Sequence, residues 1–218
     1  MNLDQVRIIA HRGNSRALPE NTMAAFRSAV MVGAHMVEAD VRLSREGVPV
    51  VIHDADVSRT TTAQGPVSSL HEDQLRKLGV PALEEVLTLA IAVNVEVKAE
   101  AAIPAILELV HGRTDVIVSS LDVGALEFLR QLSPELRLAF LSGEADCEAV
   151  LSRAHEAGAY AFNPPASCVS PRLVEQAHAA GLRIMPFTVN DVAEAKRFFG
   201  WGVDAMFTDD PASMLAIL

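Results

Sequence analysis

The stretch VGAHMVEAD, residues 32–40, contains the pattern from which the fold can be predicted. A glycine ends an alanine-rich amphipathic stretch, a short apolar run follows, and a polar residue closes the run. The same order returns in AGAYAFN (157–163), AGLRIMPFTVN (180–190) and WGVDAMFTD (201–209). Glycine commonly ends helices because it adopts the left-handed conformation without a Cβ penalty. Each of these segments therefore predicts the end of a helix followed by a buried strand.

Eight apolar segments fit this description along the chain. They are residues 6–10, 36–41, 94–97, 116–118, 137–141, 160–162, 183–187 and 205–207. Apolar strands that alternate with helices indicate a parallel sheet covered by those helices. Eight such units in 218 residues predict an α/β fold, a closed (β/α)₈ TIM barrel, as one domain over residues 1–218. An open doubly wound sheet is the alternative, and it is disfavoured because no GxGxxG follows the first strand.

A further apolar run, VPVVIHD at residues 48–54, follows the second strand after only SREG. That connection is too short for a parallel crossover, so it predicts a β-hairpin extension after the second strand. With Glu46 and Gly47 as the turn pair, Asp40 would face His53, and Glu38 would lie on the same face. A one-residue bulge in the turn would break this pairing.

Composition narrows the classes of function. The 18 Lys and Arg residues against 28 Asp and Glu give a net charge of −10, which argues against a nucleic-acid partner. No apolar run is long enough for a transmembrane segment. The two cysteines lack the spacing of a zinc site or a disulfide framework. We expect a soluble, cytoplasmic protein, and the oligomeric state is open.

Ionisable residues gather at the ends of three predicted strands and in the hairpin. They are His11 and Arg12 after the first strand, Glu38 and Asp40 in the second, His53 in the hairpin, and Glu96 and Lys98 in the third. Taken alone, a glutamate here would be an edge or salt-bridged residue, a histidine would be a hydrogen-bonded core residue, and Lys98 would neutralise Glu96. Burying several charges costs several kcal/mol each unless they bind a metal or one another. Since active sites of this fold lie at the carboxyl ends of the strands, the set predicts a catalytic site.

The residue types indicate a phosphodiesterase. The three carboxylates are hard oxygen donors, which predict one divalent cation, Mg²⁺ or Ca²⁺. Arg12 and Lys98 add positive charge that would bind a phosphate group. Histidine is the side chain that can exchange protons near neutral pH, so one of His11 and His53 could take a proton from the nucleophile while the other gives one to the leaving alcohol.

The chain also resembles a known family along nearly its whole length. The segments AHRG, PENT, VEADVRLSREGVPVVIHD, SRTT, PALEEVL, VEVK, VSSLD, FTVN and FTDDP are similar in order and spacing to those of glycerophosphodiester phosphodiesterases. The resemblance implies a TIM barrel, a metal on Glu38, Asp40 and Glu96, and His11 and His53 as the acid–base pair. It implies hydrolysis of a small-molecule glycerophosphodiester to glycerol 3-phosphate and an alcohol, and it leaves open a route through a cyclic phosphate.

Departures from the family pattern bear on the pocket. Phe187 stands where the family usually has tryptophan before TVN, and Leu121 stands where phenylalanine is common. We expect Phe187 to contact the substrate and to influence which head group is preferred. Asn21 is expected to cap the first helix rather than to serve the site. For Asp209, helix capping and ligand contact are equally compatible with its place at a strand end.

Other functions stay open on the sequence. Lysophospholipase D-type activity on lysophospholipids would use the same residues. A Schiff-base aldolase would use Lys98 and would leave the three carboxylates without a role. A non-catalytic phosphate-ligand binder would keep the barrel without turnover. The pattern leaves undecided which histidine is the acid and which metal is bound.

Overall fold

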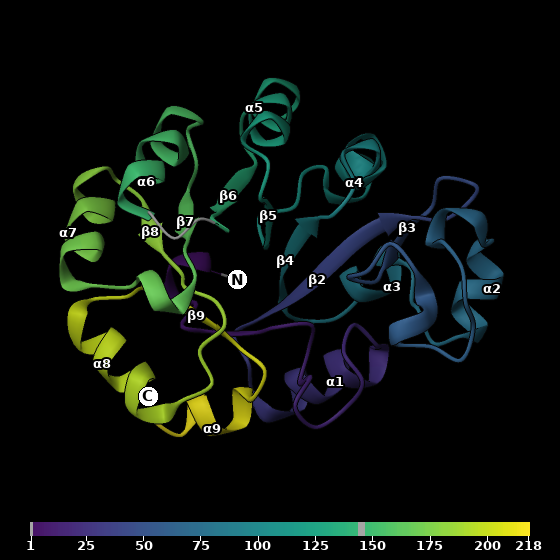
Figure 1. The fold of residues 1–218 in the computed structure, drawn as a ribbon, viewed down its shortest axis with the longest axis horizontal. Coiled ribbons are helices and arrows are strands. Elements are labelled where there is room, and N and C mark those ends of the chain that lie inside the picture. The colour runs from purple at the N-terminus through teal and green to yellow at the C-terminus, as the bar shows by residue number, and fades with distance from the viewer. Residues whose placement is uncertain (1, 144–146) are drawn as a thin grey trace.

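The computed structural model describes residues 2–143 and 147–218. Its parallel strands form a ring that helices surround (Figure 1). The strands are β1 (Ile8–Ala10), β2 (Met36–Leu43), β3 (Pro49–Val51), β4 (Ala92–Val97), β5 (Val116–Ser120), β6 (Arg137–Leu141), β7 (Ala161–Asn163), β8 (Arg183–Ile184) and β9 (Met206–Thr208). The α-helices are α1 (Met23–Val32), α2 (Glu72–Lys77), α3 (Leu83–Leu87), α4 (Ile103–Val110), α5 (Val123–Leu132), α6 (Cys147–Glu156), α7 (Pro171–Ala179), α8 (Val192–Trp201) and α9 (Pro211–Leu215).

The strand order confirms the predicted TIM barrel. The strands pair in the order β8-β7-β6-β5-β4-β2-β1-β9, and β3 pairs antiparallel with β2. Backbone hydrogen bonds from Asp204 to Ile184 (3.1 Å) and from Phe207 to Pro186 (3.0 Å) connect the two ends of this order. Every predicted strand is present, with bounds that differ by up to three residues.

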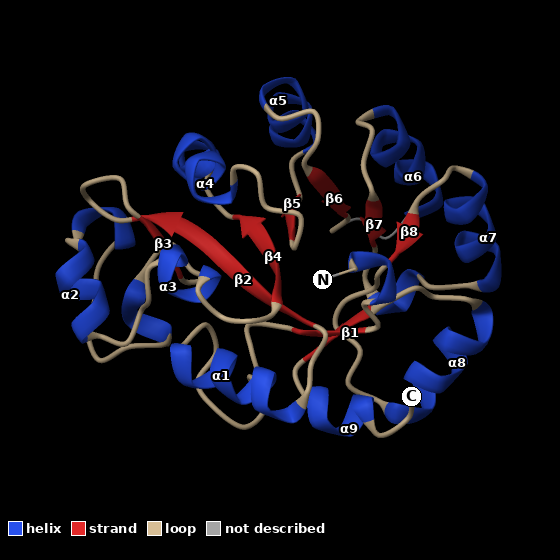
Figure 2. Ribbon diagram, turned by 180° about the vertical axis from the view of Figure 1, so that it is seen from behind, coloured by secondary structure: helices blue, strands red, loops and turns tan. Residues whose placement is uncertain are grey.

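Side chains alternate between an outer and an inner core. On β2, Val37 and Val41 pack outward under the helices, whereas Met36 packs inside the ring. Leu3 and Val6, which precede β1, join the inner cluster. The segment that precedes β1 accordingly lies at the middle of the ring (Figure 2). Apolar residues therefore fill one end of the barrel interior, and the polar inner residues of β2 and β4 lie toward the other end.

The hairpin is present, but its predicted register is wrong by one residue. Leu43 pairs with Pro49 and Val41 with Val51, and Ile52 N–H donates to the carbonyl of Asp40 at 2.8 Å. The turn contains three residues, 45–47, and Gly47 has a φ of +85°. A three-residue loop whose last residue is left-handed adds the bulge that shifts the pairing. His53 therefore follows β3 and does not pair with Asp40.

The described helices include none that is both long and apolar enough to cross a bilayer.

Candidate active site

A cleft of about 750 Å³ opens where the strands reach their carboxyl ends. Its ionisable lining residues are His11, Arg12, Glu38, His53, Glu96 and Lys98, and its apolar ones include Leu121, Leu141, Phe187 and Phe207. Asp40 is fully buried and lies 3.2 Å from both Arg12 Nε and Lys98 Nζ. The structure thus brings together all the residues that were predicted to form the site.

The three carboxylates form one compact cluster. Asp40 and Glu96 are register partners on β2 and β4, and Glu38 shares their face because side chains alternate along a strand. One oxygen from each carboxylate lies within 4.8 Å of those of the other two. Glu38, Asp40 and Glu96 are 1%, 0% and 6% exposed. Such a cluster cannot carry three negative charges without cations nearby.

This cluster fits a divalent cation. Glu38 Oε1 is buried and accepts no hydrogen bond from any residue that the structure describes. Burial, together with Asp40 and Glu96, raises the pKa of Glu38 well above its ordinary value of 4.5. Burial and Asp40 likewise raise the pKa of Glu96. Carboxylate oxygens are the ligands that Mg²⁺ and Ca²⁺ prefer, and a cation here would relieve the repulsion and give Glu38 Oε1 a partner.

A tight turn after β1 places Arg12 against the cluster. Gly13 has a φ of +81°, and a Cβ there would lie 2.7 Å from the carbonyl carbon of Ala25, so only glycine fits. The turn aims the Arg12 N–H at Glu38 Oε2, 2.9 Å away. Burial would lower the pKa of the Arg12 guanidinium, but Asp40 and Glu38 outweigh it and raise the pKa. Arg12 is therefore a fixed positive charge.

Lys98 is the second cation of the cluster. Its Nζ donates a hydrogen bond to Glu96 and lies beside Asp40. Burial would lower the pKa of Lys98, but the attraction of Asp40 and Glu96 raises it. A lysine that forms a Schiff base needs a lowered pKa, so the electrostatics of Lys98 favour anion binding over the aldolase alternative.

Each histidine contacts a carboxylate through Nδ1. His11 Nδ1 is 2.7 Å from Asp209 Oδ1, and His53 Nδ1 is 2.7 Å from Asp54 Oδ1. A carboxylate accepts hydrogen bonds, so Nδ1 carries the proton and Nε2 is the acceptor of each ring; in His11 this Nε2 accepts a hydrogen bond from Arg12 Nε at 3.2 Å. Burial would raise the pKa of Asp209, but hydrogen bonds from His11 and Asn190 lower it to about 2. The sequence left helix capping and ligand contact open for Asp209. In the structure Asp209 contacts His11, and Asp210 caps α9.

Asn21 was expected to cap α1, and that prediction is wrong. Thr22 is the cap, because its hydroxyl oxygen accepts a hydrogen bond from Ala25 N–H at 3.2 Å. Asn21 is buried, has a φ of +56°, and donates from Nδ2 to Asp40 Oδ2 at 2.7 Å. Asparagine tolerates this left-handed conformation better than most residues. Asn21 therefore orients a carboxylate of the cluster.

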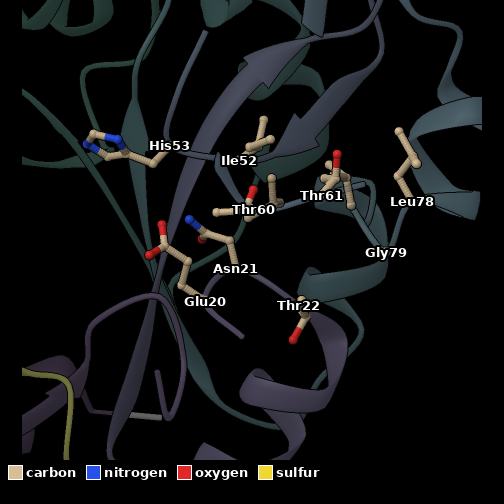
Figure 3. Close-up of a pocket in the computed structure, with 11 residues that line it drawn as sticks. Glu20, Asn21, Thr22, Ile52, His53, Thr60, Thr61, Leu78 and Gly79 are labelled. Carbon is tan, nitrogen blue, oxygen red and sulfur yellow. The ribbon is translucent and has the colours of Figure 1, made fainter. Parts of the chain in front are cut away.

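The sequence reasoning also missed the residues that hold His53 and Arg12. Arg59 donates to Asp54 and to Glu20, and Glu20 accepts from Arg12 at 2.8 Å. Figure 3 shows a small pocket beside the site, in which the Glu20 carboxylate and the Asn21 amide extend toward the side where the His53 ring lies. The signal was present in the segments PENT, SRTT and VVIHD, which contain Glu20, Arg59 and Asp54 respectively.

Comparisons with known proteins agree with this geometry. A sequence profile described as the Glycerophosphoryl diester phosphodiesterase family matches residues 11–213. The chain is 33% identical over 239 residues to a glycerophosphodiester phosphodiesterase of Caldanaerobacter subterraneus, covering 97% of each chain. It is similar in fold (TM-score 0.88, 28% identity) to an Oleispira antarctica phosphodiesterase in complex with the product sn-glycerol-3-phosphate, covering 96% of this chain and 95% of that one. It is equally similar (TM-score 0.88, 27% identity) to a Thermotoga maritima glycerophosphodiester phosphodiesterase, covering 98% of each chain.

The matched region contains both histidines, both cations and all three clustered carboxylates. On this evidence, the chain belongs to the glycerophosphoryl diester phosphodiesterase family.

Proposed function

We propose that this chain hydrolyses glycerophosphodiesters to glycerol 3-phosphate and an alcohol, using one divalent cation and His11 and His53 as the acid–base pair. The strongest support is the cleft itself, in which a buried carboxylate cluster, two cations and two carboxylate-held histidines meet. The product in the Oleispira antarctica structure, sn-glycerol-3-phosphate, is the product expected here.

Glu38, Asp40 and Glu96 would hold the cation. Bound there, Mg²⁺ or Ca²⁺ would supply positive charge to the phosphate oxygens as they gain negative charge. Asn21 keeps the Asp40 carboxylate oriented through its 2.7 Å hydrogen bond. Mg²⁺ requires a more regular geometry than Ca²⁺, so the activity with each metal distinguishes them.

Arg12 and Lys98 would hold the phosphate in the orientation needed for attack. Both contact Asp40, and each keeps donors that can reach an anion in the cleft. The histidines would then act at Nε2. One takes the proton of the nucleophile, either water or the neighbouring glycerol hydroxyl, as its oxygen bonds to phosphorus, and the other gives a proton to the alcohol oxygen as the bond from phosphorus to that oxygen breaks. When the glycerol hydroxyl attacks, water then opens the cyclic phosphate to glycerol 3-phosphate.

The apolar part of the cleft would receive the organic parts of the substrate. Phe187 and Phe207 pack edge to face, and Leu121 is half exposed beside the cleft. An exposed leucine here supports lysophospholipids as a second class of substrate, since an acyl chain would cover it. A panel of glycerophosphodiesters and lysophospholipids with each metal distinguishes the two classes.

The test is release of glycerol 3-phosphate by the purified chain. EDTA should abolish it, and Mg²⁺ or Ca²⁺ should restore it. Substitution of either His11 or His53 should lower kcat by about 10²–10⁴-fold while phosphate still binds. The variant that lacks the histidine acting as general acid should regain activity on a p-nitrophenyl ester, because that leaving group needs no proton. Turnover that persists in both variants would refute the acid–base roles.

Four further expectations stay predictions. Cell fractionation tests a cytoplasmic location, and gel-shift measurements test the absence of a nucleic-acid partner. Limited proteolysis tests whether residues 1–218 form one domain, and gel filtration reports the oligomeric state.

A further inference from the structure

The two histidines are joined by an unbroken series of polar contacts. In order, the members are Asp209, His11, Arg12, Glu20, Arg59, Asp54 and His53. Carboxylates alternate with basic groups along it, except where Arg12 Nε donates directly to His11 Nε2 at 3.2 Å. The members come from three stretches of the chain, residues 11–20, residues 53–59 and Asp209, and the series links the two histidines that line the cleft.

Arg59 is the central member of this series. Its Nε donates to Asp54 Oδ2 at 2.5 Å, and its Nη1 and Nη2 donate to the two oxygens of Glu20 at 3.0 and 2.7 Å. One planar guanidinium thus holds two carboxylates in a fixed relation. Asp54 in turn contacts His53, and Glu20 contacts Arg12.

The electrostatics keep both carboxylates charged. Hydrogen bonds from Arg59 and then His53 lower the pKa of Asp54, and the hydrogen bond from Arg59 is the largest cause that lowers the pKa of Glu20 to about 2. Both acids are therefore ionised throughout the pH range in which histidine titrates. Arg59 is 46% exposed, and ion pairs at such positions contribute little to folding stability.

We propose that Arg59 is a positioning residue, which holds Asp54 against His53 and Glu20 against Arg12 and so couples proton transfer to phosphate binding. This inference rests on the proposed function. It differs from an ordinary surface ion pair because both partners of Arg59 contact groups that line the cleft. Lysine cannot replace it, since a single ammonium group lacks the fork that reaches both carboxylates.

The test uses R59Q and R59K, with R76Q as the matched control. Arg76 also contacts two carboxylates, Glu72 and Glu85, but it lies on α2 outside the cleft. We expect R59Q to lower kcat by about 10–100-fold, because His53 loses its orientation, and to raise KM about three- to tenfold, because Glu20 no longer holds Arg12 in place. R59K should recover little of this loss, and R76Q should stay within about twofold of the wild type.

Double-mutant cycles separate positioning from general weakening. The effects of R59Q and D54N on kcat should not multiply, since both substitutions act on His53. The effects of R59Q and D209N on kcat should multiply, since D209N acts on His11. Guanidinium ion at low millimolar concentration should restore part of the kcat of R59A. The metal-induced rise in Tm should persist in R59Q, because Arg59 does not contact the carboxylate cluster in the described structure.

The outcomes distinguish this inference from the function on which it rests. A wild-type chain that hydrolyses no glycerophosphodiester overturns both. A wild-type chain that turns over, with an R59Q variant of unchanged kcat, overturns the role of Arg59 alone. The role of Arg59 is also overturned if the effects of R59Q and D54N on kcat multiply, or if R59K is fully active.

Discussion

Replacing Glu38 with Gln is expected to stabilise the metal-free protein. The cluster has three carboxylates, and the cations that contact it in the described structure are Arg12 and Lys98. One negative charge is left uncompensated in a buried site, which is why the pKa of Glu38 rises. Glutamine keeps the shape of the side chain and can still accept the 2.9 Å hydrogen bond from Arg12 N–H.

The size of the effect follows from the burial. An uncompensated buried charge costs several kcal/mol, and Glu38 escapes part of that by holding a proton, so E38Q should gain about 1–2 kcal/mol. For a chain of this length that is roughly 2–8 °C in Tm. Mg²⁺ at a hundredfold excess over Kd should stabilise the wild type by about 2.7 kcal/mol, or roughly 5–11 °C, and E38Q should lose most of this shift.

The stability that E38Q gains over the wild type in the metal-free protein should grow with pH. Folded Glu38 holds its proton at pH values where the unfolded chain has released it, so the folded state binds more protons. The stability of the metal-free wild type therefore falls as pH rises above about 4.5, and that decline should be smaller in E38Q.

Thermal unfolding in EDTA between pH 5 and 8, followed by a Mg²⁺ titration, measures both effects. The matched control is E84Q, which removes an exposed carboxylate from α3. A metal-free E38Q variant that melts below the wild type, or one that Mg²⁺ stabilises as much as the wild type, would refute the reasoning.

Substitutions at three further residues test the site. Asp209→Asn should lower kcat about tenfold in steady-state assays, since His11 loses its orienting partner. Folding lowers the pKa of Asp209 from 3.8 to about 2, so the contribution of this carboxylate to stability is complete above about pH 4 and is lost as pH falls toward 2. In urea unfolding, the free energies of unfolding of D209N and the wild type should therefore differ more at pH 6 than at pH 3. Asn21→Ala should destabilise the fold by about 3 kcal/mol in urea unfolding, through the lost bond to Asp40 and the positive φ, and Asn21→Gly by about 2 kcal/mol; equal losses would contradict the strain at this position. Phe187→Ala should raise KM for glycerophosphocholine roughly tenfold with kcat nearly unchanged, and an unaltered KM would place the substrate elsewhere.

The strands were predictable because their signals are local. β6 has the predicted bounds, 137–141, since an apolar run between polar flanks is enough to mark a buried strand. The convergence of Glu38, Asp40 and Glu96 also followed from the sequence, because side chains alternate along neighbouring parallel strands and active sites of this fold lie at one end.

The hairpin register was not predictable in the same way. The predicted turn has two residues, Glu46 and Gly47, whereas the observed turn has three, 45–47. The observed turn depends on the left-handed conformation of Gly47 and on the hydrogen bond from Ser44 N–H to the carbonyl of Val48. Both turns are compatible with the sequence SREG at residues 44–47, and the packing of the hairpin decides between them.

The strands, the barrel and the seven ionisable residues predicted for the site follow from patterns that neighbouring residues create, so they can be read along the chain. The partners of the site residues cannot. His11 contacts Asp209, 198 positions away, and Asp40 contacts Asn21, 19 positions away. These hydrogen bonds depend on the distance and angle at which the closed barrel brings two polar groups together, and only the packed fold decides that geometry.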